Sequence, residues 1–177
     1  MAKQIIVDEN DNVIGTKERD QIGPEDIYRI TALWLTNSKG EVLIARRALS
    51  KLHDPGMWAV AVAGTVDEGE TYDQNMVKEA EEELGIKGVK LKPLYKDFVV
   101  SIRGDNQHKY FKKVYWLDKD YSLKDLKFDP REVMAIKWIF FDDLIKDVKV
   151  HPENYVPSFG KSLQKYMLIS KNGKIPC

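Results

Sequence analysis

Residues 64–86 read GTVDEGETYDQNMVKEAEEELGI, a stretch that ends in a crowd of glutamates. Thr71 and Gln74 have the spacing of a capping box, in which each side chain satisfies the backbone N–H of the other residue. Gly85 is the residue type that ends a helix in the left-handed conformation. The stretch therefore predicts a helix over 71–84.

This helix would place three glutamates on one face. At about 100° per residue, with Glu79 at zero, Glu82 falls at roughly −60° and Glu83 at about +40°. On the same projection Lys78 flanks this face but lies away from the three acids. A separate apolar arc, which should pack against a sheet, consists of Met76, Val77, Ala80 and Leu84.

Two interpretations of the acidic face are open. One is a solvated surface, although such surfaces usually interleave lysine to offset a repulsion of roughly 0.2–0.5 kcal/mol per like-charged pair. The other is a site for a hard divalent cation, because clustered carboxylates are the ligands that Mg²⁺ prefers. In the second case, binding of the cation would relieve the repulsion.

The spacing of the whole stretch resembles the signature of the Nudix hydrolases. In that signature a glycine and a glutamate precede an Arg-Glu pair, and two adjacent glutamates, a glycine and an aliphatic residue follow it. The matching positions are Gly64, Glu70, Glu79, Ala80, Glu82, Glu83, Gly85 and Ile86. The single departure is Lys78, which stands where the family has arginine.

The resemblance implies an α/β fold, a Nudix-type α/β/α sandwich with a mixed β-sheet, in which a loop–helix–loop presents Mg²⁺ or Mn²⁺ to a diphosphate. The residues that would hold the metal and carry catalysis, here named the box glutamates, are Glu79, Glu82 and Glu83. The residues that would support the motif are Gly64, Glu70, Lys78 and Gly85. Gly64 would let the loop approach closely. Because lysine cannot make the forked hydrogen bonds of arginine, Lys78 predicts a working but slower site.

Residues 46–58, RRALSKLHDPGMW, and the hairpin before them look like the Nudix branch that includes isopentenyl-diphosphate isomerases. Those isomerases need a cysteine just before the box glycine and a metal-binding histidine just after it, where this chain has Ala63 and Thr65. Tyr28 stands where a further histidine is expected. Alanine and threonine can neither protonate an alkene nor hold the isomerase metal, which favours a hydrolase.

The same similarity gives a meaning to basic residues near this segment. Matching residues in the isomerase branch contact diphosphate, and guanidinium groups suit phosphate oxygens. Arg46, Arg47 and Lys51 would therefore bind substrate, or they are solvated charges at the end of a strand. Trp58 either lines the substrate pocket or belongs to the core.

Family members often recruit a further carboxylate from a loop beyond the box. Asp105 and Glu132 are the candidates here, and each is otherwise a surface acid. The three histidines, His53, His108 and His151, are too widely spaced for a metal-ligand pattern. We expect His53, near the substrate loop, to be a surface residue.

Hydrophobic periodicity and turn signals indicate a mixed-sheet α/β domain. The predicted strands are 4–7, 12–17, 28–36, 41–46, 58–63, 94–102, 109–117 and 134–140. The predicted helices are 71–84, 141–147 and about 157–169. We expect one domain over 1–177, in which a strand hairpin over 1–27 precedes a core over 28–177 with a C-terminal helix.

Composition limits the partners. The 177 residues carry 28 basic and 28 acidic side chains, so no broad attraction to nucleic acid or to an anionic membrane is expected. The one cysteine, Cys177, cannot form an intrachain disulfide. Neither a secretion signal nor a membrane-spanning stretch is evident, so we expect a cytoplasmic protein. The first hairpin could serve as a homodimer contact.

Three functions follow, in decreasing order of support. The first is a Mg²⁺- or Mn²⁺-dependent pyrophosphohydrolase that cleaves the phosphoanhydride of a small-molecule diphosphate, such as a nucleoside diphosphate derivative. The second is a non-catalytic module that senses a nucleotide in the same pocket, and the third is isopentenyl-diphosphate isomerase. Nucleotides, nucleotide sugars and prenyl diphosphates all stay open as substrates.

Overall fold

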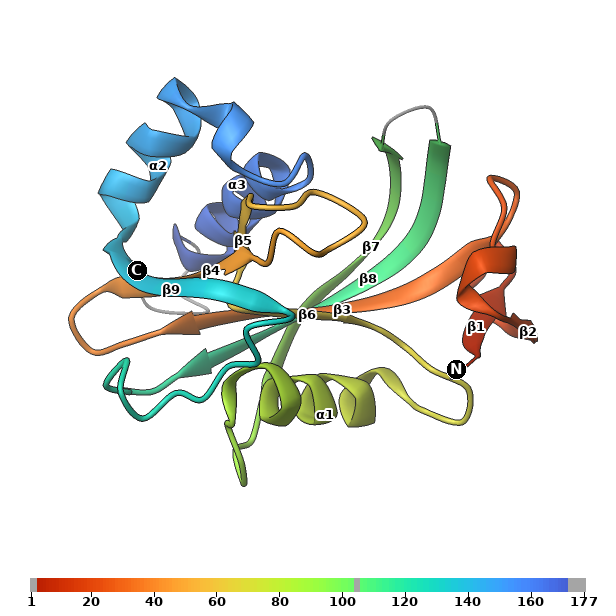
Figure 1. Ribbon diagram of the computed structural model, residues 1–177, viewed down its shortest axis with the longest axis horizontal. Coiled ribbons are helices and arrows are strands. Elements are labelled where there is room, and N and C mark those ends of the chain that lie inside the picture. Colours follow the sequence, from red (N-terminus) through yellow and green to blue (C-terminus); the bar gives the residue numbers. More distant parts are fainter. Residues whose placement is uncertain (1–2, 104–105, 172–177) are drawn as a thin grey trace.

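The computed structural model describes residues 3–103 and 106–171, which form a mixed sheet of nine strands and three α-helices (Figure 1). The strands are β1 (Gln4–Val7), β2 (Val13–Lys17), β3 (Ile27–Thr36), β4 (Glu41–Arg47), β5 (Trp58–Val60), β6 (Val62–Thr65), β7 (Lys92–Arg103), β8 (Asn106–Asp118) and β9 (Val133–Phe140). The helices are α1 (Tyr72–Leu84), α2 (Phe141–Val150) and α3 (Phe159–Lys171), with short 3₁₀ turns at Arg19–Gln21 and Pro152–Asn154. Within these described ranges no helix is long and apolar enough to cross a membrane.

Strand β3 organises the sheet. Along one edge it pairs in turn with β1, β6 and β4, all antiparallel. Along its other edge it runs parallel to β8 over its whole length, from Ile27 beside Lys109 to Thr36 beside Asp118. This parallel pairing makes the sheet mixed, and it brings segments from distant parts of the sequence beside one strand.

Different helices cover the two faces of β3. Leu33 and Leu35 pack in the cluster that contains α1, whereas Ala32 and Trp34 pack in the cluster that contains α2 and α3. The alternation follows from the pleat of a strand, which sends successive side chains to opposite faces. In Figure 1 the sheet accordingly lies between α1 and the α2–α3 pair, which confirms the predicted α/β/α sandwich.

Most predicted elements are confirmed to within a few residues, and the segment 58–63 is the exception. The sequence predicts one strand there, but the chain forms two, because β5 pairs with β4 and β6 pairs with β3. The crossing occurs at Ala61, which has no exposed surface. A buried crossing needs no polar turn residue, so the run WAVAVA carries no signal of the break.

The N-terminal hairpin is joined to the rest of the sheet, because β1 pairs with both β2 and β3. In the hairpin turn the Asp11 carboxylate accepts hydrogen bonds from Arg29 Nε at 2.7 Å and from the Tyr72 hydroxyl at 3.0 Å. Burial opposes the ionised form, but these bonds and one from Lys96 outweigh it and lower the pKa of Asp11. The contacts support the proposal that hairpin and core form one domain.

Candidate functional site

The caps that define α1 form as predicted. The Thr71 hydroxyl accepts the backbone N–H of Gln74 at 3.2 Å, and the Gln74 side chain accepts the N–H of Thr71 at 2.9 Å. At the other end Gly85 has a φ of 70° and donates its N–H to Glu81 O at 2.9 Å. Local chemistry therefore fixes where the acidic helix begins and ends.

The apolar arc of α1 packs on the sheet. Met76, Ala80 and Leu84 are buried in the cluster on that face. Val77, which the helical projection assigns to the same arc, is 44% exposed. It lies at the rim of the arc, so this part of the prediction is wrong.

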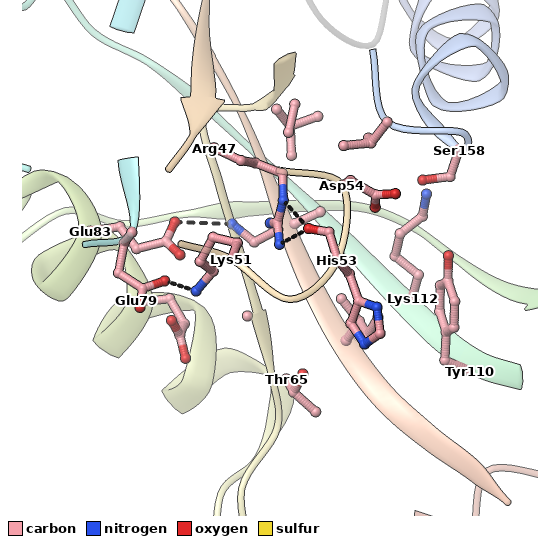
Figure 2. A pocket seen from close by; sticks show the side chains of 18 of the residues that line it. Arg47, Lys51, His53, Asp54, Thr65, Glu79, Glu83, Tyr110, Lys112 and Ser158 are labelled. Atoms are coloured by element: carbon pink, nitrogen blue, oxygen red, sulfur yellow. Dashed lines mark hydrogen bonds and ion pairs between the residues drawn. The ribbon is translucent and has the colours of Figure 1, made fainter. Parts of the chain in front are cut away.

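A cavity of about 630 Å³ opens beside the acidic face of α1. Most of its wall comes from helices α1 and α3, from strands β3, β4, β5, β6 and β8, and from loop residues at 51–54, 129–132 and 156–158. All three box glutamates line it, as Figure 2 shows for Glu79 and Glu83. The volume falls in the range of pockets that bind small organic ligands.

Glu79 reaches the cavity beside a residue that has no side chain. Gly64 of β6 lies against the Glu79 carboxylate, and a Cβ built on Gly64 would stand 2.2 Å from Cδ of Glu79. Two carbon atoms cannot approach so closely without a shift of the backbone or of the glutamate. The close approach expected at Gly64 is therefore made to the side chain of Glu79.

The Glu79 and Glu83 carboxylates lie in surroundings that disfavour their charge. Burial raises the pKa of Glu79 to about 7, and the Glu82 carboxylate adds to the rise. Burial raises the pKa of Glu83 to about 8, with a further rise from Glu79 and an opposing hydrogen bond from the Ala63 N–H at 3.3 Å. A cation placed among these groups would stabilise their ionised forms.

This donor set fits a hard divalent cation, because it consists of carboxylate oxygens. Within residues 3–103 and 106–171, no group of three acidic, histidine or cysteine side chains already converges at ligand spacing. Glu82 is exposed, so its side chain can rotate toward Glu79 and Glu83 without repacking the core. Convergence on one ion therefore needs a change of rotamer and no change of fold.

Lys78 takes part in the acidic cluster. Its ammonium lies 2.7 Å from Glu70 Oε1, 2.9 Å from Asp67 Oδ2 and 3.8 Å from Glu79 Oε1. Burial lowers the pKa of Lys78, but the hydrogen bonds to Glu70 and Asp67 outweigh burial and raise it. The projection that puts Lys78 away from the box glutamates is wrong for Glu79, because it ignores the reach of a long side chain.

Asn75 is a buried residue of the site that sequence reasoning missed. Its Nδ2 donates to Thr65 O at 2.9 Å and to Glu70 Oε2 at 2.9 Å, and it lies 3.3 Å from Glu79 Oε1. Its Oδ1 accepts the Thr31 hydroxyl. The available signal was a polar residue four positions before Glu79, on the same helical face.

Two of the predicted basic residues and one predicted carboxylate line the cavity with the box glutamates. Arg47 donates from Nε and Nη2 to the His53 carbonyl at 3.0 and 2.8 Å (Figure 2). Lys51 forms an ion pair with Glu132. The other candidate carboxylate, Asp105, lies outside the described residues.

Arg46 and Trp58 lie away from the described cavity wall. Arg46 is exposed, donates to the Gly56 carbonyl at 2.8 Å, and has its guanidinium carbon 5.9 Å from the centre of the Trp58 ring. Trp58 is partly buried and packs against the core cluster under α2 and α3. These positions favour the core interpretation of Trp58 over a pocket role.

The positions that an isomerase would use are part of the site. Ala63 and Thr65 both line the cavity, and Tyr28 is buried with its hydroxyl 3.3 Å from His108 Nδ1. The cavity wall therefore carries neither the cysteine nor the histidine that isomerase chemistry needs at these two places.

The three histidines are not gathered at one point. His53, expected at the surface, is half-buried and lines the cavity, with its ring centre 5.5 Å from that of His108. His151 is exposed and lies beside Glu153. His53 therefore shares the cavity wall with the box glutamates.

Comparison with known proteins agrees with the motif. A family model described as the NUDIX domain matches residues 27–159. An isopentenyl-diphosphate Delta-isomerase of Enterobacter sp. (strain 638) is 28% identical over 155 residues, which are 86% of this chain and 84% of the relative. A prenyl-diphosphate phosphatase of Methanosarcina mazei is 28% identical over 160 residues, which are 90% of this chain and 91% of the relative.

Solved structures show the same relationship. The Deinococcus radiodurans protein DR0079 superposes with a TM-score of 0.77 at 25% identity, covering 92% of this chain and 98% of that one. The matched domain spans more than half of the sequence, and the similarity to an isomerase and to a phosphatase extends over most of it. The chain therefore belongs to the Nudix family, in the branch related to isopentenyl-diphosphate isomerases.

Proposed function

We propose that this protein is a divalent-cation-dependent pyrophosphohydrolase that cleaves a phosphoanhydride in a small diphosphate compound. The observation that carries the proposal is one cavity lined by two kinds of charge, carboxylates and basic groups. The lining residues concerned are Glu79, Glu82, Glu83, Arg47 and Lys51. Carboxylate oxygens suit the cation and basic nitrogens suit phosphate oxygens, so the cavity offers both partners that a metal–diphosphate complex needs.

Glu79, Glu82 and Glu83 would hold Mg²⁺ or Mn²⁺, with Glu132 as a further carboxylate at the cavity wall. Such a cation, when bound, neutralises charge that develops on phosphate oxygens and lowers the pKa of a bound water. Asn75, 3.3 Å from Glu79 Oε1, would keep that carboxylate directed at the site.

Arg47 and Lys51 would bind the diphosphate. The His53 carbonyl holds the guanidinium of Arg47 in place, so this side chain is ordered before the substrate arrives. Lys51 is paired with Glu132, and a phosphate oxygen would compete for the same ammonium. Binding would then release the Glu132 carboxylate, which we assign as a candidate acceptor of the proton from the attacking water.

The cavity disfavours the two alternatives. An isomerase needs the acid and the metal ligand that Ala63 and Thr65 do not provide. Lys78, the one departure from the motif, is the residue that would favour a sensing module, but it contacts Glu70 and Asp67 as an orienting residue would.

Phosphate release over a panel of diphosphates with Mg²⁺ or Mn²⁺ tests the proposal. We expect Glu82→Gln and Glu83→Gln to lower kcat by roughly 100-fold or more, since each removes a carboxylate that would bind the metal ion. Glu81→Gln is the matched control, because Glu81 lies on the same helix but pairs with Lys87 at 2.8 Å. We expect this control to keep wild-type activity.

Full metal-dependent activity of the Glu83→Gln protein would contradict the assignment. Tight nucleotide binding without phosphate release from any compound, with wild-type protein and either metal, would support the sensing module instead. Circular dichroism of each variant checks that a loss of activity is not a loss of fold.

A further inference from the structure

Lys112 is a buried cation in the cavity that the proposed reaction does not use. It lies on β8, is only 9% exposed, and lines the same cavity as the box glutamates. In Figure 2 Lys112, Tyr110, Ser158 and Asp54 are drawn on one side of the view, with Glu79 and Glu83 on the other. The cavity therefore has an acidic end and, away from it, a lysine end.

The ammonium of Lys112 donates to Ser162 Oγ at 2.6 Å. In the described part of the chain no carboxylate forms an ion pair with it, although its neighbour Lys113 pairs with Asp73 at 2.7 Å. Burial lowers the pKa of Lys112 to about 8, and the more distant Asp97 opposes this only in part. An ammonium has three N–H donors, so a buried one with a single serine partner still has donors for a ligand.

Hydroxyl groups share the cavity wall with this lysine. Ser162 accepts its hydrogen bond, and Tyr110 and Ser158 line the same cavity. The apolar side chains of Ile30, which is paired with Lys112 in the sheet, and of Phe159 line it too. A hydrocarbon chain at this end would remove water from the ammonium and the hydroxyls and give them no acceptor in return. A polar group with acceptor oxygens would satisfy them and could still pack on the apolar side chains.

We infer that Lys112 determines substrate specificity by donating a hydrogen bond to an acceptor oxygen on the group that the diphosphate carries. The substrate would then be a nucleoside or sugar diphosphate and not a prenyl diphosphate, the compound class in the name of the Methanosarcina relative. The inference rests on the proposed hydrolysis, because it places the diphosphate at the acidic end of the cavity.

Lys112→Met removes the charge and keeps the length of the side chain. We expect kcat/KM for UDP-glucose and CDP to fall by roughly 10- to 100-fold, the loss typical of one charge-assisted hydrogen bond, with no fall for geranyl diphosphate. Lys113→Met is the matched control on the opposite face of the same strand, and both substrate classes should keep their wild-type values in it.

A binding measurement separates this inference from the proposed function. Calorimetry of UDP with metal-free protein in EDTA should show an affinity weaker by a similar factor in Lys112→Met than in Lys113→Met. If wild-type protein hydrolyses no diphosphate, the proposed function fails while this measurement still tests Lys112.

The inference is overturned if Lys112→Met lowers kcat/KM equally for UDP-glucose and geranyl diphosphate, or if its affinity for UDP is unchanged. It is also overturned if wild-type protein prefers geranyl diphosphate to every nucleoside and sugar diphosphate. This last comparison needs no variant, so it decides the question even if Lys112→Met does not fold.

Discussion

The acidic end and the lysine end of the cavity differ in how the chain builds them. Three carboxylates at the acidic end come from about one turn of α1, whereas the lysine end combines Lys112 of β8 with Ser158 and Ser162 near the start of α3. Both ends bury charge at a cost, but the charge has opposite sign. In our proposals one end binds a cation, and the other binds an acceptor oxygen of the substrate.

This difference explains why the acidic end can be recognised in the sequence and the lysine end cannot. Residues at i, i+3 and i+4 on a helix share a face whatever the rest of the fold does. Lys112 and Ser162 are fifty positions apart, and their contact exists only because β8 lies in the sheet beneath α3.

Apart from the loss of a box glutamate itself, the largest effect is expected from Gly64→Ala at the acidic end. The added methyl carbon would stand 2.2 Å from Cδ of Glu79, so the carboxylate must leave its position. We expect kcat to fall by roughly 100-fold, since a proposed metal ligand is displaced, and the free energy of unfolding to fall by about 1–3 kcal/mol. Kinetics and urea denaturation measure the two effects.

Gly15→Ala is the control for this substitution. Gly15 also lies in a strand, but nothing stands within 4 Å of a Cβ built there. We expect wild-type kcat and a change in stability of less than about 0.5 kcal/mol. Equal effects at Gly64 and Gly15 would remove the argument that close packing positions Glu79.

The next largest effect is expected from Asn75→Ala, which removes the side chain that hydrogen-bonds to Glu79 and Glu70 at the acidic end. The change leaves the Thr31 hydroxyl and the Thr65 carbonyl without their Asn75 partner, so the free energy of unfolding should fall by about 2 kcal/mol. Because Glu79 also loses a contact, we expect kcat to fall by roughly tenfold. A loss of stability with unchanged kcat and unchanged metal dependence would make Asn75 purely structural.

The sequence predicted the fold in good detail because most of its signals are local. Alternating apolar residues and turn signals marked the hairpin of β3 and β4, and the capping box and Gly85 marked α1. The break between β5 and β6 was missed because the crossing is buried and apolar, at Ala61. Local sequence patterns predict individual strands and helices well, but they predict poorly which of these elements pair with one another.

The same limit applies to the candidate site. The spacing along the helix identified the box glutamates, and the family resemblance added Arg47, Lys51 and Glu132. All of these residues line one cavity. Asn75 and Lys112 were missed because each has meaning only through a partner distant in sequence, Thr31 at 44 positions and Ser162 at 50. A buried polar residue cannot be distinguished from a solvated one before the packing is known.

A smaller effect, on stability, is expected from Lys112→Met at the lysine end. The variant removes a buried ammonium, so near neutral pH and without ligand we expect it to be more stable than wild type by on the order of 2 kcal/mol. A gain in stability together with a loss of affinity for polar substrates is the mark of a functional buried charge. Thermal unfolding in the absence of substrate measures the gain.

The pH dependence of that gain follows from the lowered pKa. Folding lowers the pKa of Lys112 from 10.5 to about 8, so between these values the unfolded chain holds the proton more tightly. Wild-type stability should therefore rise through this window relative to Lys112→Met, and the gain should disappear above pH 10.5. A gain that stays constant from neutral pH to that limit would show that packing, and not charge, is responsible.

The smallest effect is expected from Lys78→Arg, which restores the family residue. The Lys78 ammonium already lies 2.7 Å from Glu70 and 2.9 Å from Asp67, so an arginine fork would mostly repeat existing contacts. We expect kcat/KM to stay within about threefold of wild type, whereas Lys78→Met, which removes both contacts, should lower it by roughly tenfold. A rise of about tenfold or more in Lys78→Arg would instead show that the fork itself orients Glu79 and that lysine makes this site slow.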